Sequence, residues 1–202
     1  MIELRLRGVR LRLDFSFFAV LLLFLLLDKS GYGLMGLYAC LIHELGHVIA
    51  MAFCGCRPDH VDFYGAGIRI TSYDEYKLAF WPQLAVLAFG SLANFISFGL
   101  LYATSEYDLS ARMFAVIHLL IGLFNMLPLP VFDGGRILSL LLGRLMGPQT
   151  ADTLARLVGT LVLGLLLAGA VWLYVHGRIN FTAVGTAAYL TVVALFSAPA
   201  AK

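Results

Sequence analysis

Two histidines and a glutamate lie inside an apolar segment, and this combination narrows what the chain can fold into. The segment Gly33–Phe53 is long enough to cross a bilayer as one helix, yet it contains His43, Glu44 and His47. Because positions four apart share one face of a helix, His43 and His47 can bind one metal ion, with Glu44 beside it. The alternative, polar residues that only bond across a helix bundle, fits a complete His-Glu-x-x-His poorly.

The rest of the chain is similarly apolar. Of its 202 residues, 61% are hydrophobic and 13% are charged, which is more apolar surface than a soluble domain of this size can cover. We therefore expect an all-α polytopic membrane protein. Six apolar blocks predict about six transmembrane helices: Phe15–Leu27, Gly33–Phe53, Leu78–Ala103, Phe114–Leu127, Leu157–Val175 and Phe181–Phe196. The first and fourth blocks are shorter than the roughly 20 residues that a span needs, so five spans remain an alternative.

The positive charges predict an orientation in the membrane. With a cytoplasmic N-terminus and six crossings, eleven Lys and Arg residues face the cytoplasm and three face the outside. We therefore expect the active-site side to be cytoplasmic. The formal net charge of +2 gives no reason to expect a nucleic-acid partner, because the arginines are explained as topology signals and as contacts with anionic lipid.

Two short stretches have the pattern of β-hairpins. Residues 1–14 alternate strictly between apolar and polar side chains around Gly8, which predicts a short amphipathic hairpin at the inner membrane surface rather than a cleavable signal peptide. Val61–Ile70 contains the glycines Gly65 and Gly67 and predicts a second hairpin with a glycine turn.

A third metal ligand is needed, because catalytic zinc usually binds three protein side chains and one water. Asp133 is the best candidate in the sequence. It follows Pro128 and Pro130, which end the fourth apolar helix, and precedes Gly134–Gly135, which we expect to allow a sharp backbone turn. The alternative is that Asp133 only caps the helix predicted at Arg136–Leu145.

These residues resemble the site-2 protease family of zinc intramembrane metalloproteases. Members carry His-Glu-x-x-His in one transmembrane helix and Asn-x-x-Pro-x-x-x-x-Asp-Gly in a later one. Seven residues of this chain match the two motifs: His43, Glu44, His47, Asn125, Pro128, Asp133 and Gly134. The resemblance implies one Zn²⁺ per chain, bound by His43, His47 and Asp133.

The resemblance also implies roles for the other matching residues. Glu44 would act as the catalytic base, and Asn125 would stabilise the developing oxyanion or bind the substrate backbone. Gly65–Gly67 resembles the re-entrant β-loop of the family, and Gly90–Asn94 resembles its Gly-Pro-x-x-Asn signature, although Ser91 replaces the proline. The predicted substrate contacts are Gly65, Gly67, Asn94, Asn125 and Pro128.

The implied function is intramembrane proteolysis. The substrate would be a membrane-spanning or membrane-associated protein, such as a transcription-factor precursor or an anti-sigma factor, cut near the cytoplasmic side. A membrane-bound regulatory or inhibitory protein is a further expected partner. We expect a single membrane-embedded domain over residues 1–202, with a core at 1–147, two more transmembrane helices at 152–198 and no PDZ or other soluble domain. This compact form is most like the stage IV sporulation protein FB type.

The competing hypothesis is a non-proteolytic zinc carrier or scaffold. A carrier needs several polar side chains along its path, whereas only Asn94 and His118 lie elsewhere in the predicted spans. A scaffold has no use for Glu44, which is not placed as a ligand. For His118 we expect a hydrogen bond within the helix bundle rather than a place at the metal.

Overall fold

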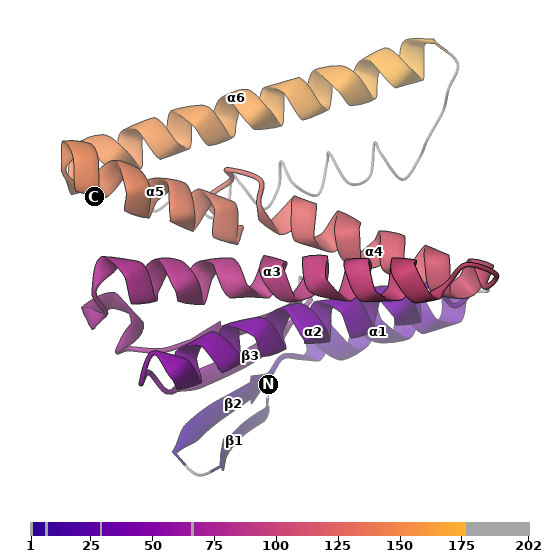
Figure 1. The fold of residues 1–202 in the computed structure, drawn as a ribbon, viewed down its shortest axis with the longest axis horizontal. Helices are drawn as coiled ribbons and strands as arrows, with labels where there is room; N and C mark the ends of the chain where they lie inside the picture. Colours follow the sequence, from indigo (N-terminus) through magenta and orange to yellow (C-terminus); the bar gives the residue numbers. More distant parts are fainter. Residues whose placement is uncertain (1, 7, 29, 66, 177–202) are drawn as a thin grey trace. The chain divides into compact units, whose positions relative to one another are not determined.

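The structure is a computed structural model that describes residues 2–6, 8–28, 30–65 and 67–176 (Figure 1). The chain divides into two compact units, Met1–Phe124 and Asn125–Lys202, which we describe separately. The last predicted span, Phe181–Phe196, lies outside the described residues. Within them the fold is mostly helical with one small sheet, in agreement with the predicted class.

Both predicted hairpins form, and they join into one sheet in the first unit. Four strands follow the chain in order: β1 (Ile2–Leu6), β2 (Val9–Leu13), β3 (His60–Tyr64) and β4 (Gly67–Thr71). The pairs β1–β2 and β3–β4 are antiparallel, as the alternating pattern predicts. The parallel pairing of β2 with β3 was not predicted, because it connects segments that are far apart in sequence.

The sheet has one apolar and one polar face. Its register aligns Leu11 with Val61 and Leu13 with Phe63, so apolar side chains of neighbouring strands lie on the same side. Helix α1 (Phe15–Leu27) contacts β3 there, with the rings of Phe17 and Phe63 5.3 Å apart. The sheet is thereby attached to the helices of its unit.

Two long helices form the centre of the first unit. Helix α2 (Tyr32–Phe53) packs along α3 (Phe80–Thr104), the largest contact between any two elements of the described chain. The shorter α4 (Leu109–Asn125) is tied to α3 by a hydrogen bond of 3.1 Å, which the Ser91 hydroxyl donates to the Gly122 carbonyl. The 3₁₀ turn η1 (Glu75–Lys77) precedes α3. Buried small and apolar side chains fill the space between these helices.

The second unit begins after α4 and contains two further helices. Helix α5 (Asp133–Met146) starts at Asp133 itself, three residues before the predicted start, and Gly147 leads into α6 (Pro148–Val175). The prediction that Gly134–Gly135 makes a sharp turn is wrong, because both glycines are helical and neither has a positive φ. They are required for close packing instead: a Cβ on Gly134 would collide with the Met126 carbonyl, and one on Gly135 with that of Leu129.

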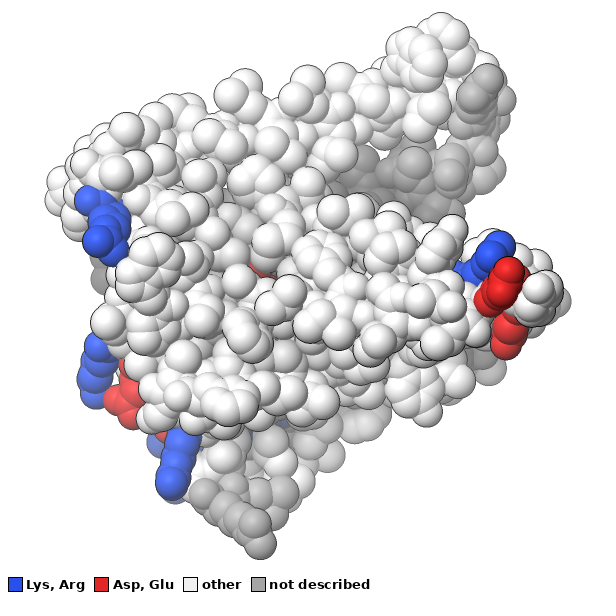
Figure 2. Space-filling view, in the orientation of Figure 1, with Lys and Arg blue, Asp and Glu red and all other residues white. Residues whose placement is uncertain are grey.

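Among the described residues, three helices are long and apolar enough to cross a membrane: α2, α3 and α6. Helix α1, with 13 residues, and α4, with 17, are shorter, as the lengths of their apolar blocks indicate. Helix α3 itself contains no charged residue, and Figure 2 shows charged side chains near both of its ends. This distribution is typical of a helix whose middle lies in hydrocarbon.

Candidate metal centre

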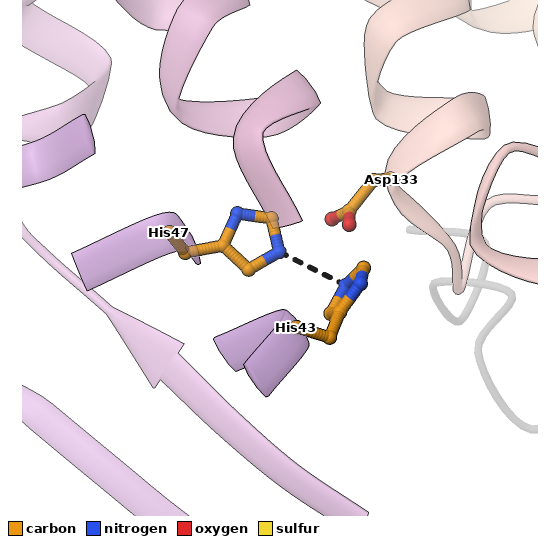
Figure 3. Close-up of side chains that lie close together, drawn as sticks. All are labelled: His43, His47 and Asp133. Atoms are coloured by element: carbon orange, nitrogen blue, oxygen red, sulfur yellow. Dashed lines mark hydrogen bonds between the residues drawn. The ribbon is translucent and has the colours of Figure 1, made fainter. Parts of the chain in front are cut away.

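His43 and His47 lie one helical turn apart on the inner side of α2. Both side chains are buried, and their Nε2 atoms are 3.1 Å apart (Figure 3). The rings meet edge to face, with centroids 4.8 Å apart. Two nitrogen ligands on one tetrahedral zinc ion, each at its usual bond length, lie about 3.3 Å from each other. The two imidazoles therefore have the spacing of a metal-binding pair.

The second nitrogen of His47 has a partner that leaves Nε2 available for a metal. Nδ1 of His47 lies 2.7 Å from the backbone carbonyl of Val86 on α3. A carbonyl oxygen only accepts hydrogen bonds, so Nδ1 carries the ring proton and donates it. The neutral ring then presents its Nε2 lone pair to the space in front of His43.

Gly90 makes room for both rings. An added Cβ at this position would lie 2.7 Å from Cε1 of His47 and 2.8 Å from Cε1 of His43. Helix α3 can approach the histidines this closely only because residue 90 has no side chain. The Gly90–Asn94 signature thus packs against the metal-binding rings themselves, which is more specific than ordinary packing between helices.

Asp133 is a helix residue and not a helix cap. Phe132 occupies the N-cap position of α5, and its side chain makes no capping hydrogen bond. Asp133 is the first residue of the helix, and its carboxylate lies near the positive end of the helix dipole, 4.0 Å from Nη1 of Arg136. The carboxylate therefore offers an oxygen ligand of a kind that zinc binds.

The described residues contain one group that could hold a metal ion: His43, His47 and Asp133. All three side chains are buried, and the atoms that they offer as ligands lie within 4.8 Å of one another (Figure 3). Two imidazole nitrogens and one carboxylate oxygen form a donor set typical of catalytic zinc, which leaves one coordination position open. The residues present therefore fit the metal that the motifs predict.

Comparison with known proteins agrees with this chemistry. Residues 103–168 match the sequence model of Peptidase family M50. The fold is similar to that of a site-2 protease from Methanocaldococcus jannaschii, with a TM-score of 0.70 and 19% identity over 100% of this chain and 96% of that one. At this identity the structural likeness shows the fold alone. No curated protein matches the chain.

This chain is a zinc metalloendopeptidase that is similar to Peptidase family M50. The peptidase is a multi-pass membrane protein, and its substrate is a protein. This assignment opposes the hypothesis of a carrier or scaffold.

The predicted catalytic residues outside the metal-binding group occupy two helices of the peptidase. Glu44 follows His43 on α2 and is half-buried, and Asn125 is the last residue of α4. Pro128 comes three residues later, in the segment that packs against the start of α5. Their roles in the reaction stay predictions.

The glycines predicted to contact substrate lie in the β3–β4 hairpin of the peptidase. The Gly65 amide donates a hydrogen bond of 3.0 Å to the Ser16 hydroxyl, and an added Cβ at residue 65 would lie 3.2 Å from Cβ of Ser16. Gly67 has a φ of 135°, which other residues rarely adopt, and open space where its Cβ would be. Strand β4 lies at one edge of the sheet, so its outer side pairs with no other strand among the described residues.

Two further polar residues contact the metal-binding pair or its neighbour, and sequence reasoning did not place them there. Asn94 is fully buried, with Nδ2 3.4 Å from Nδ1 of His43. His118 is also fully buried, with Nδ1 3.0 Å from Oδ1 of Asn94, which confirms the predicted hydrogen bond within the bundle. Only the spacing of Asn94 four residues after Gly90, on one face of α3, could have indicated its position beside the histidines.

Proposed function

We propose that this peptidase cuts membrane-spanning or membrane-associated proteins near the cytoplasmic side of the bilayer. The observation that carries the proposal is the buried histidine pair of α2, whose Nε2 atoms face each other inside a helix able to cross a membrane. Such a pair is costly at this depth and is explained by a hydrolytic metal site.

In this proposal His43, His47 and Asp133 hold the zinc ion. When bound, zinc acts as a Lewis acid towards the attacking water and the scissile carbonyl. The two histidines bind through Nε2, and the carboxylate of Asp133 supplies the anionic ligand. Burial of all three side chains excludes competing water and strengthens the electrostatic interactions at the site.

Glu44 is the proposed general base. It lies next to His43 on α2, and it does not belong to the metal-binding group. It takes a proton from the attacking water and later gives a proton to the leaving amine, as one carboxylate can do in both halves of a hydrolysis. The side-chain amide of Asn125 is the proposed donor to the developing oxyanion or to the substrate backbone.

The substrate must unwind before it can be cut, because peptide bonds in a helix are shielded by their own hydrogen bonds. We infer that the unwound segment adds to the free edge of β4, where backbone hydrogen bonds provide affinity without requiring a particular sequence. Gly65 and Gly67 keep side chains away from this approach, and Pro128, in the turns that follow α4, is a further proposed substrate contact. Asn94 enters this scheme only as a predicted contact.

The cytoplasmic position of the cut follows from the distribution of Lys and Arg. Labelling of introduced cysteines from either side should place residues 57–77 and 136–156 inside, and residues 105–110 outside. The regulatory proposals are broader: a transcription-factor precursor or an anti-sigma factor as substrate, and a membrane-bound inhibitor. The assignment to the compact sporulation type is part of this proposal and is supported by the alternating N-terminal strands.

The test uses the purified peptidase in liposomes with a single-span substrate protein that carries a helix-destabilising pair of residues near its cytoplasmic end. Mass spectrometry of the products locates the cut. Cleavage within the span, dependent on zinc and absent with Glu44→Gln, is the expected result. Cleavage confined to soluble parts of the substrate, at an equal rate with either enzyme, would contradict the proposal.

A further inference from the structure

Asn94 and His118 are fully buried polar side chains of the first unit that do not belong to the metal-binding group. Each sits on a helix made mostly of apolar residues, α3 for Asn94 and α4 for His118. A buried polar group is costly unless it is hydrogen-bonded, so the way in which these two are paired carries information about their role.

The amide of Asn94 lies between two imidazole rings. Its Nδ2 is 3.4 Å from Nδ1 of His43, and its Oδ1 is 3.0 Å from Nδ1 of His118. A half-turn of the amide exchanges its oxygen and nitrogen, so two hydrogen-bond patterns are open to the same three side chains. The chemistry of His43 distinguishes between them.

His43 needs an acceptor at Nδ1 when its other nitrogen binds a metal. Its Nε2 faces Nε2 of His47, on the side of the metal-binding group. A neutral imidazole that gives the Nε2 lone pair to zinc carries its proton on Nδ1. If the amide nitrogen of Asn94 faced this ring, two donors would meet. If the amide oxygen faces it, Asn94 accepts the proton and holds the ring in place.

His118 permits the amide direction that a metal-bound His43 requires. With the oxygen turned to His43, the amide nitrogen faces Nδ1 of His118, which must then accept and carry its own proton on Nε2. That Nε2 is buried and has no hydrogen-bond partner among the described residues. Nothing described there holds His118 in the opposite tautomer, so the ring is free to accept from Asn94.

We propose that Asn94 positions His43 as a zinc ligand by accepting its Nδ1 proton, and that His118 holds the Asn94 amide in that direction. The inference rests on the metal site of the proposed function. It makes Asn94 a positioning residue rather than a substrate contact, since both ends of its amide are engaged. His47 has the corresponding support from the Val86 carbonyl, so each ligand ring is fixed from its far side by α3.

The experiment compares zinc affinity and ligand geometry in full-length variants. Asn94→Leu keeps a similar volume but removes the acceptor, and zinc affinity measured against a competing chelator should fall about 10- to 100-fold. Asn94→Asp keeps an acceptor and should restore most of the affinity. The visible absorption spectrum of the Co²⁺-substituted protein should shift for Asn94→Leu and stay close to that of the wild type for Asn94→Asp.

The matched control is Ser91→Ala. Ser91 lies on the same helix and is equally buried, but its hydroxyl bonds to the Gly122 carbonyl of the same neighbouring helix and not to an imidazole ring. Its zinc affinity and Co²⁺ spectrum should match the wild type. His118→Phe should weaken zinc binding less than Asn94→Leu does. The double variant should be no weaker than Asn94→Leu alone, because both changes act through one amide.

Unchanged zinc affinity and Co²⁺ spectrum in Asn94→Leu would overturn the inference, and so would an equal loss in Ser91→Ala. If Asn94→Leu fails to fold, nitrogen-15 NMR of histidine in the zinc-loaded wild type decides the matter. The expected result is a proton on Nδ1 of His43 and on Nε2 of His118; a proton on Nδ1 of His118 would refute the proposal. A wild type that binds zinc but cuts nothing would contradict the proposed function and leave this inference standing.

Discussion

The helix pair α2–α3 and the helix α6 are similar in apolar composition and different in what they bury. All three are long and apolar enough to cross a membrane. In the most apolar 18-residue stretch of each helix, 33% of the residues are buried in α2 and 28% in α3, compared with 6% in α6. The pair buries His43, His47 and Asn94 between its helices, whereas the buried residues of α6 are Ala151, Ala155 and Gly159, all near its start.

This difference shows where polar chemistry can exist at membrane depth. In α2 and α3, buried polar side chains have hydrogen-bond partners on a neighbouring helix, as His47 has in the Val86 carbonyl. Along α6, beyond Gly159, large apolar side chains such as Leu165 are exposed and suited to contact with lipid. Substitutions in the α2–α3 pair and in α6 should therefore have different effects.

The largest expected effect is on catalysis by the carboxylate next to the metal ligands. Glu44→Gln should lower the cleavage rate by about 10²–10⁴-fold, because Gln has nearly the same shape but cannot accept a proton. Zinc content, measured by elemental analysis, should stay at one ion per chain. Substantial cleavage by a clean preparation of this variant would remove Glu44 from the mechanism.

The next largest effect is expected on zinc binding, when the carboxylate of Asp133 is replaced. Asp133→Asn removes the anionic oxygen while keeping a side chain of nearly the same shape at the start of α5. Zinc affinity should fall by more than the roughly 10–100-fold typical of residues that only support a ligand. Full zinc content together with normal activity in this variant would mean that the third ligand lies elsewhere.

The difference between the α2–α3 pair and α6 can be tested by adding one methyl group to α3 and one to α6. Gly90→Ala places a Cβ against both ligand rings, and zinc affinity should fall about 10- to 100-fold, as it does when support of a ligand is lost. Gly169→Ala on α6 meets nothing within 4 Å and should leave zinc binding unchanged. Its unfolding free energy should rise by roughly 0.5–1 kcal/mol, the helix preference of Ala over Gly. An equal change of zinc affinity in the two variants would refute the difference between the α2–α3 pair and α6.

The smallest effect on the metal is expected in the sheet. Gly65→Val combined with Gly67→Val should retain zinc and lose most cleavage of a membrane-embedded substrate, because bulky side chains obstruct pairing along β4. Since Gly65 also packs against Ser16, circular dichroism must show that the variant is folded. Gly36→Ala, in open space on α2, provides the control. Unchanged cleavage of the membrane substrate would give the hairpin a structural role only.

The histidine pair of the candidate metal centre could be predicted because its pattern is local. His43 and His47 are four residues apart, and this spacing alone brings their side chains together on a helix. The two hairpins were equally accessible, since strict alternation and a glycine turn define them without knowledge of the rest of the fold.

The remaining features depend on contacts between distant segments. Asn94 and His43 are 51 positions apart, and nothing in the local pattern of either helix specifies that they meet. The same holds for the parallel pairing of β2 with β3. Gly134–Gly135 was misinterpreted for a related reason: a glycine can serve a turn or a close approach, and only the position of the Met126 and Leu129 carbonyls distinguishes the two.

The pairing of β2 with β3 has a practical consequence for anyone who modifies the N-terminus of this protein. A two-stranded ribbon such as β3–β4 is marginally stable by itself, and β2 supplies its third strand. Affinity tags, fluorescent fusions or deletions placed before Asp14 thus act on the support of the hairpin that contains Gly65 and Gly67. Loss of activity in such engineered proteins would then reflect a less stable β3–β4 hairpin rather than damage to the metal site. A tag at the C-terminus is the safer choice for kinetic work.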